Sequence, residues 1–144
     1  MTTGAARTVL VVEDEQENRD VLCDIVEEVI GATALPATSA AQGLEFAVER
    51  QPTLILMDLM MPDMDGYEAI RRLKQQAATR RIPIIAVSAL SGRDDREQAL
   101  AAGCVDYISK PFDLDQLADI VTRHLSQAES GPTAGDAGAP RAPA

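Results

Sequence analysis

Four short apolar runs, each only four or five residues long, constrain the fold of this chain most, and the first three of them are nearly continuous. They fall at residues 8–12, 54–57, 84–87 and 105–108. The first three are rich in Val, Ile and Leu, which is typical of strands buried on both faces of a parallel sheet. A weaker run at 32–37 contains Pro36. Because proline is tolerated at a sheet edge, this run predicts an edge strand.

Segments with apolar residues at helical spacing separate these runs. The predicted helices are one ending at the C-cap Gly31, one from the N-cap Ser39 to Arg50, one opening at Asp65 and Gly66, one at about 94–102 before Gly103, and one from about Asp113. The side chains expected on buried helix faces are Leu22, Ile25, Val26, Val29, Tyr67, Ile70, Leu73, Leu114, Leu117, Ala118, Val121 and Leu125.

The order of elements is therefore strand then helix, five times over. Strands that alternate with helices imply right-handed crossovers and a parallel sheet covered on both faces, which is a three-layer αβα sandwich of the α/β class. Residues 1–128 are predicted to form this single domain. Residues 129–144 are rich in Ala, Gly and Pro without periodicity, and predict a disordered tail or a linker.

Charge and composition exclude several classes of function. The formal net charge of −10 argues against binding to a nucleic-acid backbone, which needs clustered Lys and Arg. No run approaches the roughly 18 apolar residues of a membrane span, and the N-terminus lacks the pattern of a signal peptide. Cys23 and Cys104 are isolated and are expected to be buried thiols in a reducing compartment. A cytoplasmic protein is predicted, with no membrane and no nucleic-acid partner.

Polar residues follow the ends of the predicted strands. In chain order they are Glu13 and Asp14, Asp58, Ser88, and Lys110 with Pro111. The carboxyl ends of parallel strands meet at one edge of the sheet, where ligands bind in such folds. Three carboxylates there would repel one another unless a cation lay among them, and Mg²⁺ prefers such oxygen ligands. An ammonium and a metal together could neutralise a phosphate.

These residues resemble the receiver domain of response regulators over about residues 7–127. The matching pieces are Glu13 and Asp14, residues 56–66 (LMDLMMPDMDG), Ser88 and Ala89, Tyr107, and Lys110 and Pro111. The layout is similar to that of stand-alone regulators of chemotaxis or the cell cycle. The resemblance implies a flavodoxin-like receiver fold, with strand order 2-1-3-4-5.

The resemblance also implies a role for each residue at the acidic edge. Asp58 is then the nucleophile and the phosphoacceptor. Asp14, Asp58 and the backbone carbonyl of Met60 would bind the Mg²⁺ cofactor directly, and Glu13 would act through a water on the metal. Glu13 is one methylene longer than the Asp often found at this position.

The remaining matched residues would complete a switch. Ser88 and Lys110 would each contact a phosphoryl oxygen, Tyr107 would be the aromatic switch residue, and the bond before Pro111 would be cis. The implied function is a two-component or phosphorelay signalling switch. It is not an enzyme beyond its own phosphorylation and autodephosphorylation.

Partners follow from the same resemblance. The phosphodonor would be a sensor histidine kinase or a histidine phosphotransfer protein. The output would be a downstream protein, bound through the face of the fourth helix, fifth strand and fifth helix. No output domain follows residue 128, so output is expected through protein contacts.

Other interpretations of these residues remain open. The chain could be a phosphorelay shuttle, a phosphate sink, or an unphosphorylated scaffold. A Mg²⁺-dependent aspartyl phosphatase would need a second acid two residues after Asp58, where Met60 stands. A nucleotide-binding protein would need a Gly-rich loop in place of Glu13 and Asp14. His124 is expected to be a helix-end residue rather than a ligand or a catalyst.

Overall fold

The computed structural model describes residues 7–90 and 92–130, which alternate between strands and helices as predicted. The elements are β1 (Thr8–Val12), α1 (Gln16–Asp24), the π-helical segment η1 (Ile25–Ile30), β2 (Thr33–Ala37), α2 (Ala40–Arg50), β3 (Leu54–Met57), α3 (Gly66–Gln75), β4 (Ile84–Ser88), α4 (Arg93–Ala102), β5 (Asp106–Ser109) and α5 (Leu114–Ser130).

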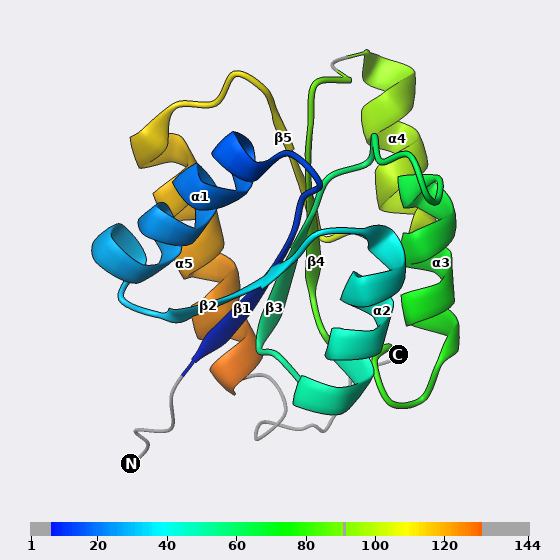
Figure 1. The fold of residues 1–144 in the computed structure, drawn as a ribbon, viewed down its shortest axis with the longest axis horizontal. Helices are drawn as coiled ribbons and strands as arrows, with labels where there is room; N and C mark the ends of the chain where they lie inside the picture. The colour runs from blue at the N-terminus through cyan, green and yellow to red at the C-terminus, as the bar shows by residue number, and fades with distance from the viewer. Residues whose placement is uncertain (1–6, 91, 131–144) are drawn as a thin grey trace.

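The five strands form one parallel sheet in the order β2-β1-β3-β4-β5. Helices α1 and α5 cover one face of it, and α2, α3 and α4 cover the other (Figure 1). This confirms the αβα sandwich and its strand order. The strand that contains Pro36 lies at the edge, as predicted.

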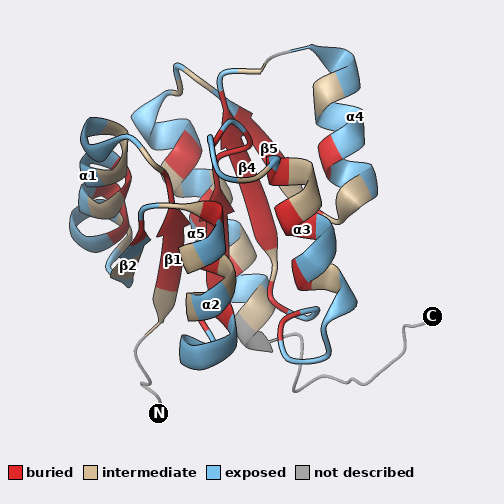
Figure 2. Ribbon diagram, turned by 45° about the vertical axis from the view of Figure 1, so that its right-hand side comes forward, coloured by how far each residue is buried: buried red, intermediate tan, exposed pale blue. Residues whose placement is uncertain are grey.

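The core consists of two apolar clusters, one on each face of the sheet. Successive residues of a strand point to opposite faces, so Val9 and Val11 pack under α1 and α5, whereas Leu10 and Val12 pack under α2 and α3. Strands β3 and β4 are therefore buried from end to end, and β1 is buried in all but its first residue, whereas the outer sides of the helices face solvent (Figure 2). Continuous apolar runs are the sequence pattern that such double burial produces.

Two of the expected core positions are exposed. Val29 is 51% exposed because the helix widens to the π-helical segment η1. There Ile30, five residues after the buried Ile25, packs against the core in place of Val29, which is four residues after it. Leu114 is 47% exposed because it starts α5, and the preceding Phe112 packs against the core instead. The fifth strand also begins one residue later than predicted, which leaves Val105 exposed.

The predicted helix ends are largely confirmed. Gly31 ends η1 in the left-handed conformation with φ of 83°, and Gly103 follows α4. The Ser39 side chain accepts a hydrogen bond from the Gln42 amide, and Asp65 accepts one from the Tyr67 amide. Each side chain thereby satisfies an amide that has no partner within the helix.

The C-terminal helix is longer than expected and changes the interpretation of His124. Helix α5 reaches Ser130, two residues past the predicted end of the domain, and residues 131–144 of the predicted tail lie outside the described residues. His124 thus lies within the helix rather than at its end. Its Nε2 is 3.1 Å from Oδ2 of Asp106 on β5.

The two cysteines are free thiols with different environments. Cys104 is buried, and burial raises its pKa to about 12. Cys23 is only half-buried, so the prediction of a buried thiol was wrong there, because it lies at the margin of the α1 face. Among residues 7–90 and 92–130, no helix is both long and apolar enough to cross a membrane.

Candidate functional site

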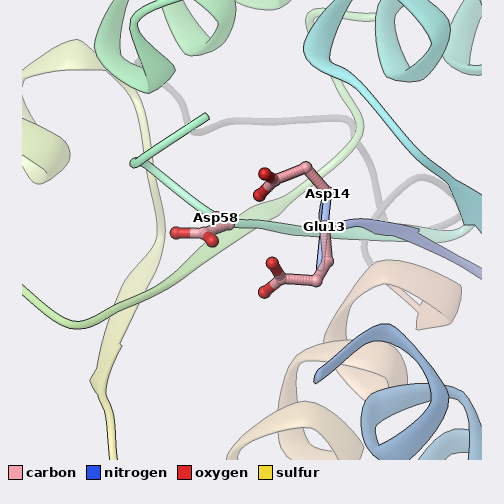
Figure 3. A group of neighbouring side chains, drawn as sticks. All are labelled: Glu13, Asp14 and Asp58. Carbon is pink, nitrogen blue, oxygen red and sulfur yellow. The ribbon is translucent and has the colours of Figure 1, made fainter. Parts of the chain in front are cut away.

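Three carboxylates meet at the edge of the sheet where β1 and β3 end. Val12 and Met57 are register partners in these neighbouring strands, and the acidic residues follow them directly. One carboxylate oxygen each from Glu13, Asp14 and Asp58 lies within 4.8 Å of the other two (Figure 3). The sequence prediction that strand ends bring these groups together is confirmed.

Glu13 is the most enclosed of the three. Its side chain is 1% exposed, and both of its carboxylate oxygens accept hydrogen bonds. Oε1 accepts from Lys110 Nζ at 2.8 Å, and Oε2 accepts from the Glu15 amide at 3.1 Å. A buried carboxylate needs such partners, since burial otherwise disfavours its charged form.

Asp58 opens the loop between β3 and α3. It is 6% exposed; its Oδ1 accepts from the Met60 amide at 3.0 Å, and its Oδ2 is 3.4 Å from Lys110 Nζ. The loop then turns back so tightly that a Cβ at Gly66 would lie 2.4 Å from the Leu59 Cα. Only glycine allows the backbone at position 66 to come this close to Leu59, which explains why glycine ends the 56–66 stretch.

Lys110 provides the cation of the site. Burial lowers the pKa of Lys110, but the hydrogen bond to Glu13 and the negative charge of Asp58 outweigh that effect, so the pKa lies above its ordinary value. The side chain therefore stays charged at neutral pH. The following bond to Pro111 is cis, the form that the resemblance implies.

The charges of the site do not balance without a cation. Three carboxylates face one ammonium, and within the described part of the chain the Asp14 carboxylate has no hydrogen bond or ion pair. Clustered carboxylates with hard oxygen atoms suit a small divalent ion. The residues present therefore fit Mg²⁺, and the Asp14 carboxylate is the one that could bind it without giving up a contact to the described residues.

Ser88 and Tyr107 meet at the loop that follows β4. Ser88 is fully buried, and its Oγ accepts from the Leu90 amide at 3.2 Å. Tyr107 is 6% exposed, and its hydroxyl donates to the Leu90 carbonyl. Burial raises the pKa of Tyr107, so it remains a neutral donor. The two predicted switch residues thus contact the same loop residue, one through its amide and the other through its carbonyl.

The structure also reveals contacts that sequence reasoning missed. Arg19 Nη1 donates to the Glu13 and Asp14 carbonyls, and the Asp63 carboxylate accepts from the Ala40 and Ala41 amides of α2. Nothing in the sequence distinguishes Arg19 from a solvated arginine. Asp63 lies within residues 56–66, the stretch that resembles receiver domains, and that resemblance was the only sequence signal for a role of this residue.

Comparisons with known proteins agree with this geometry. The family model described as "Response regulator receiver domain" matches residues 9–122. The polar-differentiation response regulator DivK of Brucella ovis is 34% identical over 122 residues, covering 85% of this chain and 98% of that protein.

Two solved receiver structures have the same fold. The receiver domain of the sensor histidine kinase PA1611 from Pseudomonas aeruginosa PAO1, described with a magnesium ion coordinated in the active-site cleft, is 34% identical. The alignment covers 85% of this chain and 99% of that receiver domain, with a TM-score of 0.77. The signal receiver domain of a histidine kinase from Syntrophus aciditrophicus is also 34% identical, with a TM-score of 0.79 and coverage of 92% and 99%.

The family match spans most of the chain, the relatives align over nearly their whole length, and the acidic cluster lies at the expected edge of the sheet. This chain belongs to the family of response regulator receiver domains of two-component signalling.

Proposed function

We propose that this receiver accepts a phosphoryl group on Asp58, with Mg²⁺ as cofactor, from a phosphohistidine on a sensor kinase or phosphotransfer protein. The observation that carries the proposal is the group of three carboxylates within 4.8 Å that faces a single ammonium. Such a site attracts a divalent cation and places a carboxylate nucleophile beside a fixed positive charge.

The metal would be held by the Asp14 and Asp58 carboxylates and by the Met60 carbonyl, with Glu13 at a greater distance. When bound, Mg²⁺ would neutralise charge on the phosphoryl oxygens. The Met60 amide supports this assignment, since its hydrogen bond to Asp58 Oδ1 keeps the loop close to the carboxylate.

In the transfer step, Asp58 attacks phosphorus as the P–N bond to the donor histidine breaks. A P–O bond forms, which gives an acyl phosphate on Asp58, and the imidazole leaves. Lys110 would pair with one phosphoryl oxygen and Ser88 would donate to another. Most of the catalysis is positioning and charge neutralisation.

The output would pass through the loop after β4. A phosphoryl oxygen that accepts from the Ser88 hydroxyl would draw Ser88 toward Asp58. The Leu90 amide, which donates to Ser88 Oγ, would then have to follow or lose that bond, and the Leu90 carbonyl is held by the Tyr107 hydroxyl. We propose that this change alters the face of α4, β5 and α5, which a downstream protein binds. A near-complete switch needs the phosphorylated site to stabilise the active state over the inactive state by about 5.5 kcal/mol.

The free thiols support a reducing, cytoplasmic location.

The intact-protein mass after incubation with acetyl phosphate, with and without Mg²⁺, tests the proposal. We expect one added phosphoryl group that requires Mg²⁺ and is lost in Asp58→Asn. Asp119→Asn, an exposed acid on α5, is the matched control and should label normally. Failure to label with acetyl phosphate and with a panel of autophosphorylated kinases would overturn the proposal in favour of an unphosphorylated scaffold.

A further inference from the structure

Arg19 is a half-buried cation on α1 that reaches back to the backbone of the acidic pair. Its Nη1 donates to the carbonyl of Glu13 at 3.0 Å and to that of Asp14 at 3.2 Å. The Arg19 amide in turn donates to the Glu15 carbonyl at 2.9 Å, which fixes the start of the helix. One side chain therefore joins the first turns of α1 to the segment that carries two site carboxylates.

The start of α1 has few other links of this kind. Glu15, the N-cap residue, makes no side-chain cap to the helix amides. Its carboxylate instead accepts from the Asn18 side chain at 3.2 Å, and its amide donates to Glu13 Oε2. The Glu13 amide also donates to the Ala37 carbonyl at 3.1 Å, which ties Glu13 to β2. Because the helix end lacks the usual side-chain cap, the Arg19 contacts add a link from α1 to the carbonyls of both acids.

The two acids of the pair depend on their backbone to different degrees. Glu13 is held by hydrogen bonds on both carboxylate oxygens. Asp14 has no side-chain hydrogen bond or ion pair to the described residues, so its position depends on its own main chain. Arg19 donates to the carbonyls of both peptide units that flank the Asp14 Cα, the Glu13 carbonyl before it and the Asp14 carbonyl after it.

We infer that Arg19 is a positioning residue for Mg²⁺ binding, which it supports by fixing the main chain of Asp14. This inference rests on the proposed function and extends it to a residue outside the acidic cluster. Groups that orient metal ligands without touching the metal commonly change metal affinity by about 10–100-fold when removed.

The positive charge of Arg19 and its hydrogen bonds to the carbonyls are expected to change Mg²⁺ affinity in opposite directions, which allows a decisive test. A cation near three carboxylates repels Mg²⁺, so loss of the charge alone would tighten binding. Loss of the carbonyl contacts would weaken it, since Asp14 would have to be ordered when the metal binds. The sign of the change in Mg²⁺ affinity therefore separates positioning from simple electrostatics.

The experiment is a Mg²⁺ titration of the full chain followed by ¹H–¹⁵N NMR, for the wild type, Arg19→Met, Arg19→Lys and Arg123→Met. Methionine is similar in size to arginine but has no donor, whereas lysine keeps a cation that can still donate to carbonyls. Arg123 is exposed on α5, so Arg123→Met removes the same charge elsewhere. A denaturation curve for each variant shows whether the fold is intact.

We expect Arg19→Met to weaken Mg²⁺ binding by on the order of tenfold, Arg19→Lys to recover part of the loss, and Arg123→Met to match the wild type. Labelling of Arg19→Met by acetyl phosphate should recover when Mg²⁺ is raised to saturation. Unchanged or tighter Mg²⁺ binding in a folded Arg19→Met would overturn the inference. If Arg19→Met does not fold, Arg19→Gln takes its place, because glutamine is neutral and too short to reach both carbonyls. Unchanged or tighter Mg²⁺ binding in a folded Arg19→Gln would then overturn the inference.

The wild-type titration keeps this inference separate from the proposed function. If the wild type binds no Mg²⁺ and does not label, the proposed function itself fails. If the wild type binds Mg²⁺ and labels but the Arg19 variants behave identically, only the role of Arg19 is wrong.

Discussion

The loops that follow β3 and β4 leave neighbouring strands at the same edge of the sheet, but they are held in different ways. The β3–α3 loop is fixed to itself by the Gly66 amide, which donates to the Leu59 carbonyl at 3.1 Å. It is also fixed to α2 by Asp63, which accepts from the Ala40 and Ala41 amides at 3.1 and 3.0 Å.

Within the described residues, the β4–α4 loop is held mainly through Leu90, whose amide contacts Ser88 and whose carbonyl contacts Tyr107. These are the two residues that we propose form the switch. The comparison shows a difference in anchoring. The β3–α3 loop (the anchored loop), which carries the proposed phosphoacceptor Asp58, is tied to the neighbouring helix α2. The β4–α4 loop (the responsive loop) is tied at Leu90 to the two proposed switch residues and at Gly92 to Asp95 of α4.

The largest effect is expected at the tight turn of the anchored loop. Gly66→Ala places a Cβ against the Leu59 backbone, which cannot move aside as a flexible side chain could. We expect a loss of about 3 kcal/mol in the free energy of unfolding, the upper end for overpacking. Urea denaturation measures it.

Gly92→Ala is the matched control for that substitution. Its added Cβ would meet only the end of the Asp95 side chain, at 3.1 Å. The free energy of unfolding should change by less than about 1 kcal/mol. Equal effects at Gly66 and Gly92 would contradict the claim that the turn depends on this close approach.

A smaller effect is expected from Asp63→Ala, which detaches the anchored loop from α2. Loss of a helix-capping side chain costs about 1 kcal/mol at neutral pH. The Ala41 amide, and then the Ala40 amide, favour the charged carboxylate and lower the pKa of Asp63. A lowered folded-state pKa means that the stabilisation is present above the unfolded-state pKa and is lost as the pH falls through the folded-state pKa.

The stability difference between the wild type and Asp63→Ala should therefore shrink below about pH 4. Denaturation curves at pH 7 and pH 3.5 measure it, and Asp119→Asn serves as an exposed acidic control. A difference that stays constant with pH would show that Asp63 acts through packing rather than through its charge.

The smallest effect is expected from Tyr107→Phe, which removes one contact to the responsive loop and leaves the ring in the core. We expect a loss of about 0.5–1 kcal/mol and faster amide hydrogen exchange near Leu90. Mg²⁺ affinity should not change, because the anchored loop is untouched. If exchange quickened equally in both loops, the proposed difference between them would be wrong.

The sequence was most informative where burial is complete on both sides. The continuous runs at β1, β3 and β4 are typical of central parallel strands, and residues that follow such strands gather at one edge of the sheet. This is why Glu13 and Asp58 were predicted to meet. The same reasoning located Pro36 at the edge of the sheet.

Sequence reasoning failed where a single side chain or one extra residue per turn decides the geometry. The exposure of Val29 follows from the wider turn of η1, which a period of 3.6 does not represent. The contacts of Arg19, Asp63 and His124 join side chains to partners on other segments, and no local pattern encodes them.

The position of Pro36 has a consequence for self-association. A sheet with an open edge can be extended by a strand from another molecule, which is a common route to aggregation. Here the edge strand β2 has only five residues, and one of them has no amide hydrogen to donate. A second chain would therefore find an incomplete ladder on this side, which protects the domain from strand addition at high concentration.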